Sequence, residues 1–360
     1  MRNINKPLKA DQQHSKKDWF STQLLEWYHI HKRNLPWRET RDPFKIWLSE
    51  IILQQTRVNQ GLPYYLKFTE EFETIEDFAQ ADLDEILKIW QGLGYYSRAR
   101  NMHECAAMII EKYDGHFPNN YQELQNLKGI GKYTAAAIAS ICFNEAVPTI
   151  DGNVFRLTSR FFGISDDIAK ASSFKIFFDK GLQHIPEHEP GNFNQAMMEF
   201  GATVCVPKSP NCEDCIFSNL CYAHQRDMID ALPVKSKNIK IKHRYFNYHV
   251  LRYKNQILIR QRTSGDIWAG LYEFDLYESE KSLKISNFEN AKLLYSTNEI
   301  IHQLTHQKLH IQFGVFELNS EQAFEEIRNE KLMSTVSVNA LGDYAVPKPI
   351  ELFLNKEFCQ

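Results

Sequence analysis

The spacing of apolar residues changes along the chain. Before about position 225 it is typical of helices. Asp42 provides a capping side chain and Pro43 suits a first helical turn. The apolar residues that follow recur at i, i+3, i+4, i+7 and i+8: Phe44, Trp47, Leu48, Ile51 and Ile52. Residues 121–127 and the run YTAAAIASICF are also helix-prone, and few strand signals occur before position 230. We therefore predict an all-α first domain.

Beyond position 240 the apolar residues alternate with other residues, which is the period of strands. The alternating sets are Phe246, Tyr248 and Val250, and then Leu309, Ile311, Phe313 and Val315. Lys254-Asn255 is a turn signal before the strand-like run QILIR, and residues 320–332 are typical of a helix. The sequence thus predicts a flexible tail at 1–17, a helical domain at 18–232, a linker at 233–243 and an α+β domain at 244–360.

Composition indicates a soluble globular protein of two domains. The chain has 360 residues, is 43% hydrophobic and 24% charged, and carries a formal net charge of −3. No apolar run is long enough to cross a bilayer, so we expect no membrane association. The first 17 residues lack the amphipathic pattern of a transit peptide. Because the whole chain is not a polycation, any nucleic-acid surface must come from local patches. One such basic stretch lies in the linker region: Lys235, Lys237, Lys240, Lys242 and Arg244. These side chains either contact nucleic acid or only keep the linker solvated.

Four cysteines within 17 residues are the strongest chemical signal. Cys205, Cys212, Cys215 and Cys221 follow the spacing C-x6-C-x2-C-x5-C. Zinc sites usually contain two separated C-x2-C pairs, whereas this segment has one pair flanked by single cysteines at unequal distances. The spacing favours a [4Fe–4S] cluster over a zinc knuckle. Disulfides are less favoured, because nothing resembles a secretory signal and a reducing compartment keeps thiols free.

The segment LKGIGKYT predicts a hairpin between two helices. Gly129 and Gly131 permit backbone conformations and close approaches that side chains would block. The amides that open the next helix, together with Lys128 and Lys132, suit a phosphate group. Taken alone, the G-x-G pattern is also typical of a helix connection without a ligand.

Together these segments resemble the helix–hairpin–helix DNA glycosylase superfamily, and within it the adenine DNA glycosylase (MutY) family. The matching stretches occur in the family's order over nearly the whole chain: LPWRETRDPFKIWLSEIILQQTRV, WQGLGYYSRARN, LKGIGKYTAAAIAS, PTIDGNVFRLTSR, FNQAMMEFGATVC and the cysteine segment. The resemblance implies an enzyme of base excision repair that removes adenine mispaired with 8-oxoguanine, and more weakly adenine mispaired with guanine, from double-stranded DNA. It also supports the [4Fe–4S] cofactor.

The resemblance assigns the chemistry to two carboxylates. Glu50 matches the family's general acid, which protonates N7 of the flipped adenine, although helical phase alone places it at the flank of an apolar face, as a solvated residue. Asp151 matches the aspartate that stabilises the oxocarbenium-like sugar, although D-G-N is also a common helix cap. Asn153 is expected to hydrogen-bond near Asp151 and the sugar. One carboxyl should stay protonated and the other ionised.

Tyr133 occupies the place where bifunctional relatives such as endonuclease III carry a lysine nucleophile. Tyrosine is a poor nucleophile for Schiff-base chemistry, and Lys132 beside it should point elsewhere on the helix. We therefore predict base removal without efficient strand cleavage.

The resemblance also implies contacts to the flipped base and to the lesion. Trp37, Arg38 and Gln195 should line the adenine pocket. Four further residues are the expected wedge and probe residues near 8-oxoguanine: Gln55, Thr56, Leu93 and Tyr95. For Leu93 and Tyr95, ordinary core or surface packing is the alternative.

The C-terminal region resembles the family's Nudix-like domain but lacks the glutamate array of the Nudix hydrolases, so we expect it to recognise and not to hydrolyse. Leu304, Thr305 and His306 match the loop that distinguishes 8-oxoguanine from guanine, with leucine and threonine where many relatives have phenylalanine and serine. Without the resemblance, the same residues predict only a turn before a strand.

Two other functions stay open at this stage. An endonuclease III-type lyase for oxidised pyrimidines is disfavoured by Tyr133 and by the extra domain. A non-catalytic lesion-binding protein is disfavoured because Glu50 and Asp151 are both present. We expect a monomer in the cytoplasm, associated with the nucleoid if the source is bacterial.

Overall fold

The computed structural model describes residues 10–236, 241–282, 285 and 288–358, with the side chains described from residue 19 onward. The described chain forms two compact units by its contacts. Residues up to 79 and from 104 to 237 make the first, and residues 80–103 and from 238 make the second. The sequence boundaries, which keep 80–103 in the helical domain, stay a prediction. No helix among the described residues is long and apolar enough to cross a membrane.

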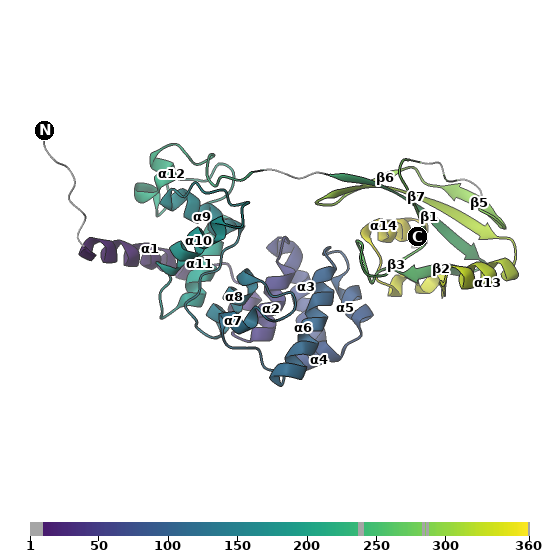
Figure 1. The fold of residues 1–360 in the computed structure, drawn as a ribbon, viewed down its shortest axis with the longest axis horizontal. Coiled ribbons are helices and arrows are strands. Elements are labelled where there is room, and N and C mark those ends of the chain that lie inside the picture. Colours follow the sequence, from purple (N-terminus) through teal and green to yellow (C-terminus); the bar gives the residue numbers. More distant parts are fainter. Residues whose placement is uncertain (1–9, 237–240, 283–284, 286–287, 359–360) are drawn as a thin grey trace. The chain divides into compact units, whose positions relative to one another are not determined.

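The chain up to residue 236 is helical wherever it has regular structure, which confirms the predicted fold class of this region (Figure 1). Its elements are α1 (Ala10–His31), η1 (Pro36–Arg38), α2 (Pro43–Ile52), α3 (Val58–Glu71), α4 (Ile75–Gln80), α5 (Leu83–Trp90), α6 (Ser97–Tyr113), α7 (Tyr121–Leu124), α8 (Lys132–Cys142), α9 (Gly152–Phe162), α10 (Ser173–Leu182), α11 (Pro190–Thr203), η2 (Ser218–Leu220) and α12 (Tyr222–Gln225). Helix α1 begins inside the segment predicted to be a tail, and residues 1–9 of that tail lie outside the described residues.

Helices α1, α9 and α11 enclose one apolar core of the first unit. Its rings pack closely, as in the stack of Phe20 on Phe217 with centroids 4.9 Å apart. Helix α2 packs against α8. Its start is as predicted, because the Asp42 carboxylate accepts a hydrogen bond from the Phe44 amide at 2.9 Å. These two helix groups position the residues of the first unit that the sequence singled out.

The C-terminal part is α+β, as predicted. Its elements are β1 (Lys242–Tyr253), β2 (Gln256–Gln261), β3 (Tyr272–Glu273), β4 (Asp275–Ser279), β5 (Ala291–Ser296), β6 (Ile300–Gln303), β7 (Gln307–Leu318), α13 (Glu321–Glu330), β8 (Ser334–Ser337), η3 (Val338–Asp343) and α14 (Lys348–Glu357). Among the described residues, the strands form one sheet in the order β3-β2-β1-β7-β5, with β4, β6 and β8 paired to β1, β7 and β2. The predicted turn at Lys254 joins β1 to β2 with a positive φ of 54°.

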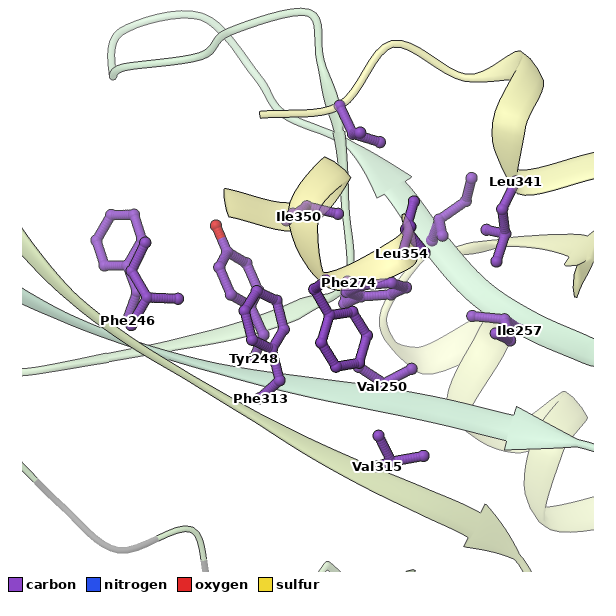
Figure 2. Packing of buried hydrophobic residues seen from close by; sticks show 14 of the residues in the cluster. Phe246, Tyr248, Val250, Ile257, Phe274, Phe313, Val315, Leu341, Ile350 and Leu354 are labelled. Atoms are coloured by element: carbon purple, nitrogen blue, oxygen red, sulfur yellow. The ribbon is translucent and has the colours of Figure 1, made fainter. Parts of the chain in front are cut away.

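Long strands β1 and β7 run parallel at the centre of this sheet, from Lys242 opposite Gln307 to Arg252 opposite Glu317. Their alternating residues, among them Tyr248, Val250 and Phe313, pack against α14 on one face (Figure 2). There Phe313 stacks on Phe353 of α14 with ring centroids 4.3 Å apart. On the other face Phe316 and Leu251 pack with residues of α13. Both faces are thus partly buried, and the alternation seen in the sequence marks the face under α14.

Part of the predicted basic linker belongs to this fold. Residues 237–240, with Lys237 and Lys240, lie outside the described residues. Arg244 lies in β1, and its buried guanidinium pairs with Asp266 and Glu278 at 2.7 Å each. Arg244 is therefore a structural ion-pair partner within this fold, and contact of the remaining basic stretch with DNA stays a prediction.

Candidate active site and cysteine cavity

A cavity of about 180 Å³ in the first unit is lined by all four predicted catalytic residues. It is far larger than the space that one water needs. Segments distant in sequence line it: η1, α2, the start of α8, the start of α9 and α11. The predicted residues among its lining are Trp37, Arg38, Glu50, Thr56, Tyr133, Asp151, Asn153 and Gln195. Gln55, next to Thr56, is exposed and has a positive φ of 56°.

Glu50 is buried, contrary to the expectation from helical phase. Helix α2 is enclosed almost all round, so its polar flank also lies inside the protein. Only 8% of Glu50 is exposed. Burial raises the pKa of this carboxyl to about 7, a hydrogen bond with Tyr133 opposes the rise, and the charge of Asp151 adds to it. Glu50 can therefore hold or release a proton near neutral pH.

Asp151 is both a helix cap and a lining residue of the cavity. Its Oδ1 accepts a hydrogen bond from the Val154 amide at 2.7 Å, and its Oδ2 accepts one from Asn153 Nδ2 at 2.8 Å. Burial raises the pKa of Asp151, and these two hydrogen bonds act against the rise. Both oxygens thus accept hydrogen bonds from fixed donors, which stabilise the carboxylate against the effect of burial.

Arg156 fixes the orientation of the Asn153 amide. Its guanidinium donates to Asn153 Oδ1 at 2.9 Å, so the Asn153 amino group faces Asp151. The same guanidinium donates to the carbonyls of Gly201 at 2.6 Å and Cys205 at 2.7 Å. One side chain therefore connects the Asp151 carboxylate to the first residue of the cysteine segment.

Glu199 forms the charged wall of the cavity and was missed from the sequence. Its buried carboxylate accepts from Arg33 Nε at 2.7 Å and from an Arg38 guanidinium nitrogen at 2.7 Å. Burial alone would raise the pKa of Glu199, but hydrogen bonds from Arg33 and Arg38 outweigh it and lower the pKa to about 2. Gln195 lies one helical turn before Glu199 on α11, so the two side chains share a face of that helix. This i, i+4 spacing is the sequence signal that could have identified Glu199 as a residue lining the cavity.

We expect Glu199→Gln to destabilise the first unit by about 3 kcal/mol, because it leaves two arginines without a buried counter-charge. The folded pKa lies below the ordinary value of 4.5, so the contribution of Glu199 is complete above pH 4.5 and is lost as pH falls toward 2. Urea unfolding at pH 7 measures the difference. Exposed Glu187→Gln is the matched control, and equal stability of the two variants would contradict the assignment.

Tyr133 lies in the first turn of α8 with its ring at the cavity. Its hydroxyl oxygen lies 3.0 Å from Met198 Sδ and also shares a hydrogen bond with the Glu50 carboxyl. Burial raises the pKa of Tyr133 well above its usual range, and the negative charges of Glu50 and Asp151 raise it further. The phenol is therefore neutral. Lys132 is exposed and lies over the ring of Phe174, 4.8 Å from its centroid. The lysine therefore points elsewhere, as helical geometry predicted.

The glycine hairpin before α8 is exposed. Gly129 has a positive φ of 75°, which favours glycine, and Gly131 caps α8 with its backbone alone. A side chain at Gly131 would meet no atom within 4 Å, so another surface can approach this backbone closely. Lys128 and Lys132 lie beside it, although Lys128 is also 3.3 Å from Glu104.

Two of the predicted lesion contacts meet in the second unit. Leu304, Thr305 and His306 form the turn between β6 and β7. The Tyr95 and Thr305 hydroxyls share a hydrogen bond of 2.5 Å, and 48% of Tyr95 is exposed. Leu93 is buried, and its role as a wedge stays a prediction.

The four clustered cysteines line one small cavity of about 20 Å³, with Arg160 and Phe217 among its other walls. All four are half-buried free thiols. Burial raises the pKa of Cys215 to about 11; an amide hydrogen bond opposes the rise, and the other three thiolates add to it. Among the described residues, no group of three ligating side chains is arranged to hold a single metal ion. The donor set of four convergent thiols, with Phe217 N–H and Arg160 donating to two sulfurs, nevertheless fits a thiolate-bound cluster.

Arg160 organises the cysteine segment from inside the core. Only 2% of it is exposed. Its guanidinium donates to the carbonyls of Val206 at 2.8 Å, Pro207 at 3.0 Å and Leu232 at 3.0 Å. This buried cation therefore holds the backbone that carries Cys205 and lies beside its sulfur.

Two family models match the chain. Residues 48–178 match the HhH-GPD superfamily of base excision DNA repair proteins, and residues 247–356 match a NUDIX domain. The first range includes Glu50, Tyr133 and Asp151, and the second includes the β6–β7 turn.

Relatives named adenine DNA glycosylase occur in several organisms. The chain is 33% identical to the adenine DNA glycosylase of Buchnera aphidicola subsp. Schizaphis graminum, over 93% of this chain and 97% of that one. It is 41% identical to the Homo sapiens adenine DNA glycosylase over 58% of this chain and 40% of that one.

Solved structures resemble about three fifths of the chain. A thermostable thymine-DNA glycosylase aligns with a TM-score of 0.55 and 30% identity, over 59% of this chain and 98% of that chain. A trapped endonuclease III–DNA covalent intermediate aligns with a TM-score of 0.51 and 24% identity, over 61% of this chain and all of that chain, and this likeness concerns the fold alone.

Proposed function

The chain belongs to the adenine DNA glycosylase family, and from this premise we propose that it removes adenine paired with 8-oxoguanine, and more weakly adenine paired with guanine, from double-stranded DNA. The bond cleaved is the N-glycosidic bond of a base that has left the stack. One observation carries the proposal: Glu50, with a raised pKa, and Asp151, held by two donors, line the same cavity.

In the proposed reaction the two acids act on opposite partners of the bond. Glu50 gives its proton to N7 of adenine, so the electron pair of the C1′–N9 bond leaves on a neutral base. Ionised Asp151 stabilises the positive charge that develops at C1′. Water then adds its oxygen to C1′ and loses a proton, which leaves free adenine and an abasic site.

Other lining residues suit a purine. Trp37 provides an apolar wall, and Gln195 and Arg38 provide polar edges. Gln195 Oε1 accepts from the Tyr28 hydroxyl at 2.9 Å, and Arg38 is held by Glu199. These fixed side chains orient the flipped base without rearrangement. Tyr133 is a neutral phenol and no amine, so we propose that the enzyme does not cut the strand efficiently.

We also propose that Cys205, Cys212, Cys215 and Cys221 hold a [4Fe–4S] cluster. When bound, such a cluster joins the segment after α11 into one unit and contributes directly to folding. The residues of this chain that prepare the site are Arg160 and Phe217, through their contacts with the sulfurs.

Recognition of DNA is assigned to three regions. The hairpin with Lys128, Gly129, Gly131 and Lys132 suits a backbone phosphate. Thr56 lines the cavity and Gln55 precedes it in the chain, while Tyr95 bonds to the β6–β7 turn and Leu93 lies two residues before Tyr95. Thr305, already bonded to Tyr95, is the residue proposed to contact the altered edge of 8-oxoguanine, with Leu304 and His306 beside it.

The test is cleavage of three duplexes by purified protein, with and without alkali. The duplexes contain adenine opposite 8-oxoguanine, adenine opposite guanine, and thymine glycol opposite adenine. After alkali we expect strand breaks at adenine in the first duplex, fewer breaks at adenine in the second, and no breaks in the third. Without alkali we expect no breaks in any of them. Breaks without alkali would overturn the monofunctional assignment. Cleavage at thymine glycol would instead favour an endonuclease III-type lyase, and binding without product a non-catalytic lesion binder.

A further inference from the structure

One face of α5 is occupied by the C-terminal fold of the second unit. Asp84, Lys88 and Gln91 are spaced by about one helical turn each and therefore share this face. Each of them bonds to a residue beyond position 260, and Arg100 on α6 does the same. Helix α5 leads directly into the loop that carries Leu93 and Tyr95.

Asp84 binds the edge of the sheet. Its two carboxylate oxygens accept hydrogen bonds from Gln261 Nε2 at 2.9 Å and from the Tyr272 hydroxyl at 2.8 Å. Gln261 ends β2 and Tyr272 begins β3, and these two residues face each other in the ladder. The Asp84 carboxylate therefore hydrogen-bonds to β2 and β3 at a pair of residues that lie opposite each other in the sheet.

Lys88 and Arg100 bind backbone carbonyls. The Lys88 ammonium donates to the carbonyls of Gly342 and Tyr344, and the Arg100 guanidinium donates to the carbonyl of Ala269. Hydrogen bonds from charged donors are stronger than neutral ones. The Gln91 side chain adds an acceptor for the Val346 amide at 3.3 Å.

Gly270 allows this close packing. Its φ of +83° favours glycine, and a Cβ there would lie 3.2 Å from Leu87 Cδ1 and 3.7 Å from Arg100 Cδ. The loop backbone therefore rests directly on the helix, and its position is fixed by contacts that leave little room to shift.

We propose that this face of α5 is the anchor that sets the β6–β7 turn against Tyr95, so that Asp84, Lys88 and Arg100 are positioning residues for selectivity at the base opposite adenine. The Tyr95–Thr305 hydrogen bond has a net worth of only about 1 kcal/mol. It cannot fix the position of the β6–β7 turn by itself, whereas the α5 face adds several hydrogen bonds at a second point of the same unit. This inference rests on the proposed function.

The test compares Asp84→Ala/Lys88→Met with the parent and with Glu85→Ala, an exposed change on the same helix. Single-turnover excision is measured opposite 8-oxoguanine and opposite guanine. In Asp84→Ala/Lys88→Met, the anchor variant, the ratio of the excision rate opposite 8-oxoguanine to that opposite guanine should fall on the order of tenfold, and the rate opposite guanine should stay nearly unchanged. The reason is that a small displacement of a substrate contact can have a large effect on rate even far from the reacting atoms. The control should keep the ratio.

A second comparison separates positioning from general damage. When Thr305→Val is already present, adding Asp84→Ala/Lys88→Met should not lower the ratio of the two excision rates any further. The hydroxyl that these residues position is then already absent. Additive losses, or an unchanged ratio in the anchor variant, would overturn the inference. Lys88→Met alone repeats the test if the double variant folds poorly. A parent enzyme without preference for 8-oxoguanine would overturn the proposed substrate instead.

Discussion

Replacing Glu50 by glutamine is expected to abolish adenine excision while leaving binding of the mispaired duplex intact. Glutamine has the shape of the protonated acid but no proton to give, so the loss should be about a thousandfold, within the range of general acid catalysis. Single-turnover excision gives the rate, and a gel-shift titration gives the affinity. Excision within tenfold of the parent rate would refute the acid role.

The pH dependence of the parent enzyme tests the same assignment. Because the pKa of Glu50 is raised to about 7, the proton donor is present below that pH and is lost above it. The excision rate should therefore be level in mildly acidic solution and fall by about tenfold for each pH unit in alkaline solution. A rate that rises with pH would mean that Glu50 acts as a base.

Stability provides the control for the glutamine variant. The folded pKa of about 7 lies above the ordinary 4.5, so the buried charge costs the folded protein stability as pH rises from 4.5 to 7, and the cost remains above 7. Glu50→Gln removes that charge. At pH 8 the variant should unfold at the same or a higher temperature than the parent, which separates lost chemistry from lost folding.

The helical and α+β parts, and most of the cavity residues, could be predicted from the sequence. Asp151 is instructive, because the same carboxylate caps α9, as the local pattern indicates, and lines the cavity, whereas its part in the reaction stays a prediction. The burial of Glu50 could not be predicted from helical periodicity. That pattern assumes that the sides of a helix away from its apolar face are exposed to solvent, whereas α2 is buried on nearly all sides. Its burial depends on elements that pack from elsewhere in the chain.

Contacts between distant segments were beyond the sequence pattern. The pairing of Glu199 with Arg33 spans 166 residues, and that of Tyr95 with Thr305 spans 210. No local period encodes either distance. The resemblance named Tyr95 and Thr305 separately as lesion contacts, whereas their hydrogen bond, and the α5 face that accompanies it, needed three-dimensional structure.

Replacing Asp151 by asparagine is expected to lower the excision rate by about a hundredfold to a thousandfold, the effect of removing one preorganised charge from a developing ionic transition state. Single-turnover rates opposite 8-oxoguanine measure it. Asp42→Asn is the matched control, because Asp42 makes the same kind of cap on α2 without lining the cavity. Its rate should equal that of the parent.

The folding of this variant can be anticipated from the same hydrogen bonds. Asparagine caps helices as well as aspartate, so its single carbonyl oxygen can still accept from Val154. Its amino group then faces the Asn153 amino group, whose other end is held by Arg156, and two donors cannot satisfy each other. Hence Asp151→Asn should be modestly less stable yet folded. A folded variant that excises adenine within tenfold of the parent rate would remove Asp151 from the mechanism.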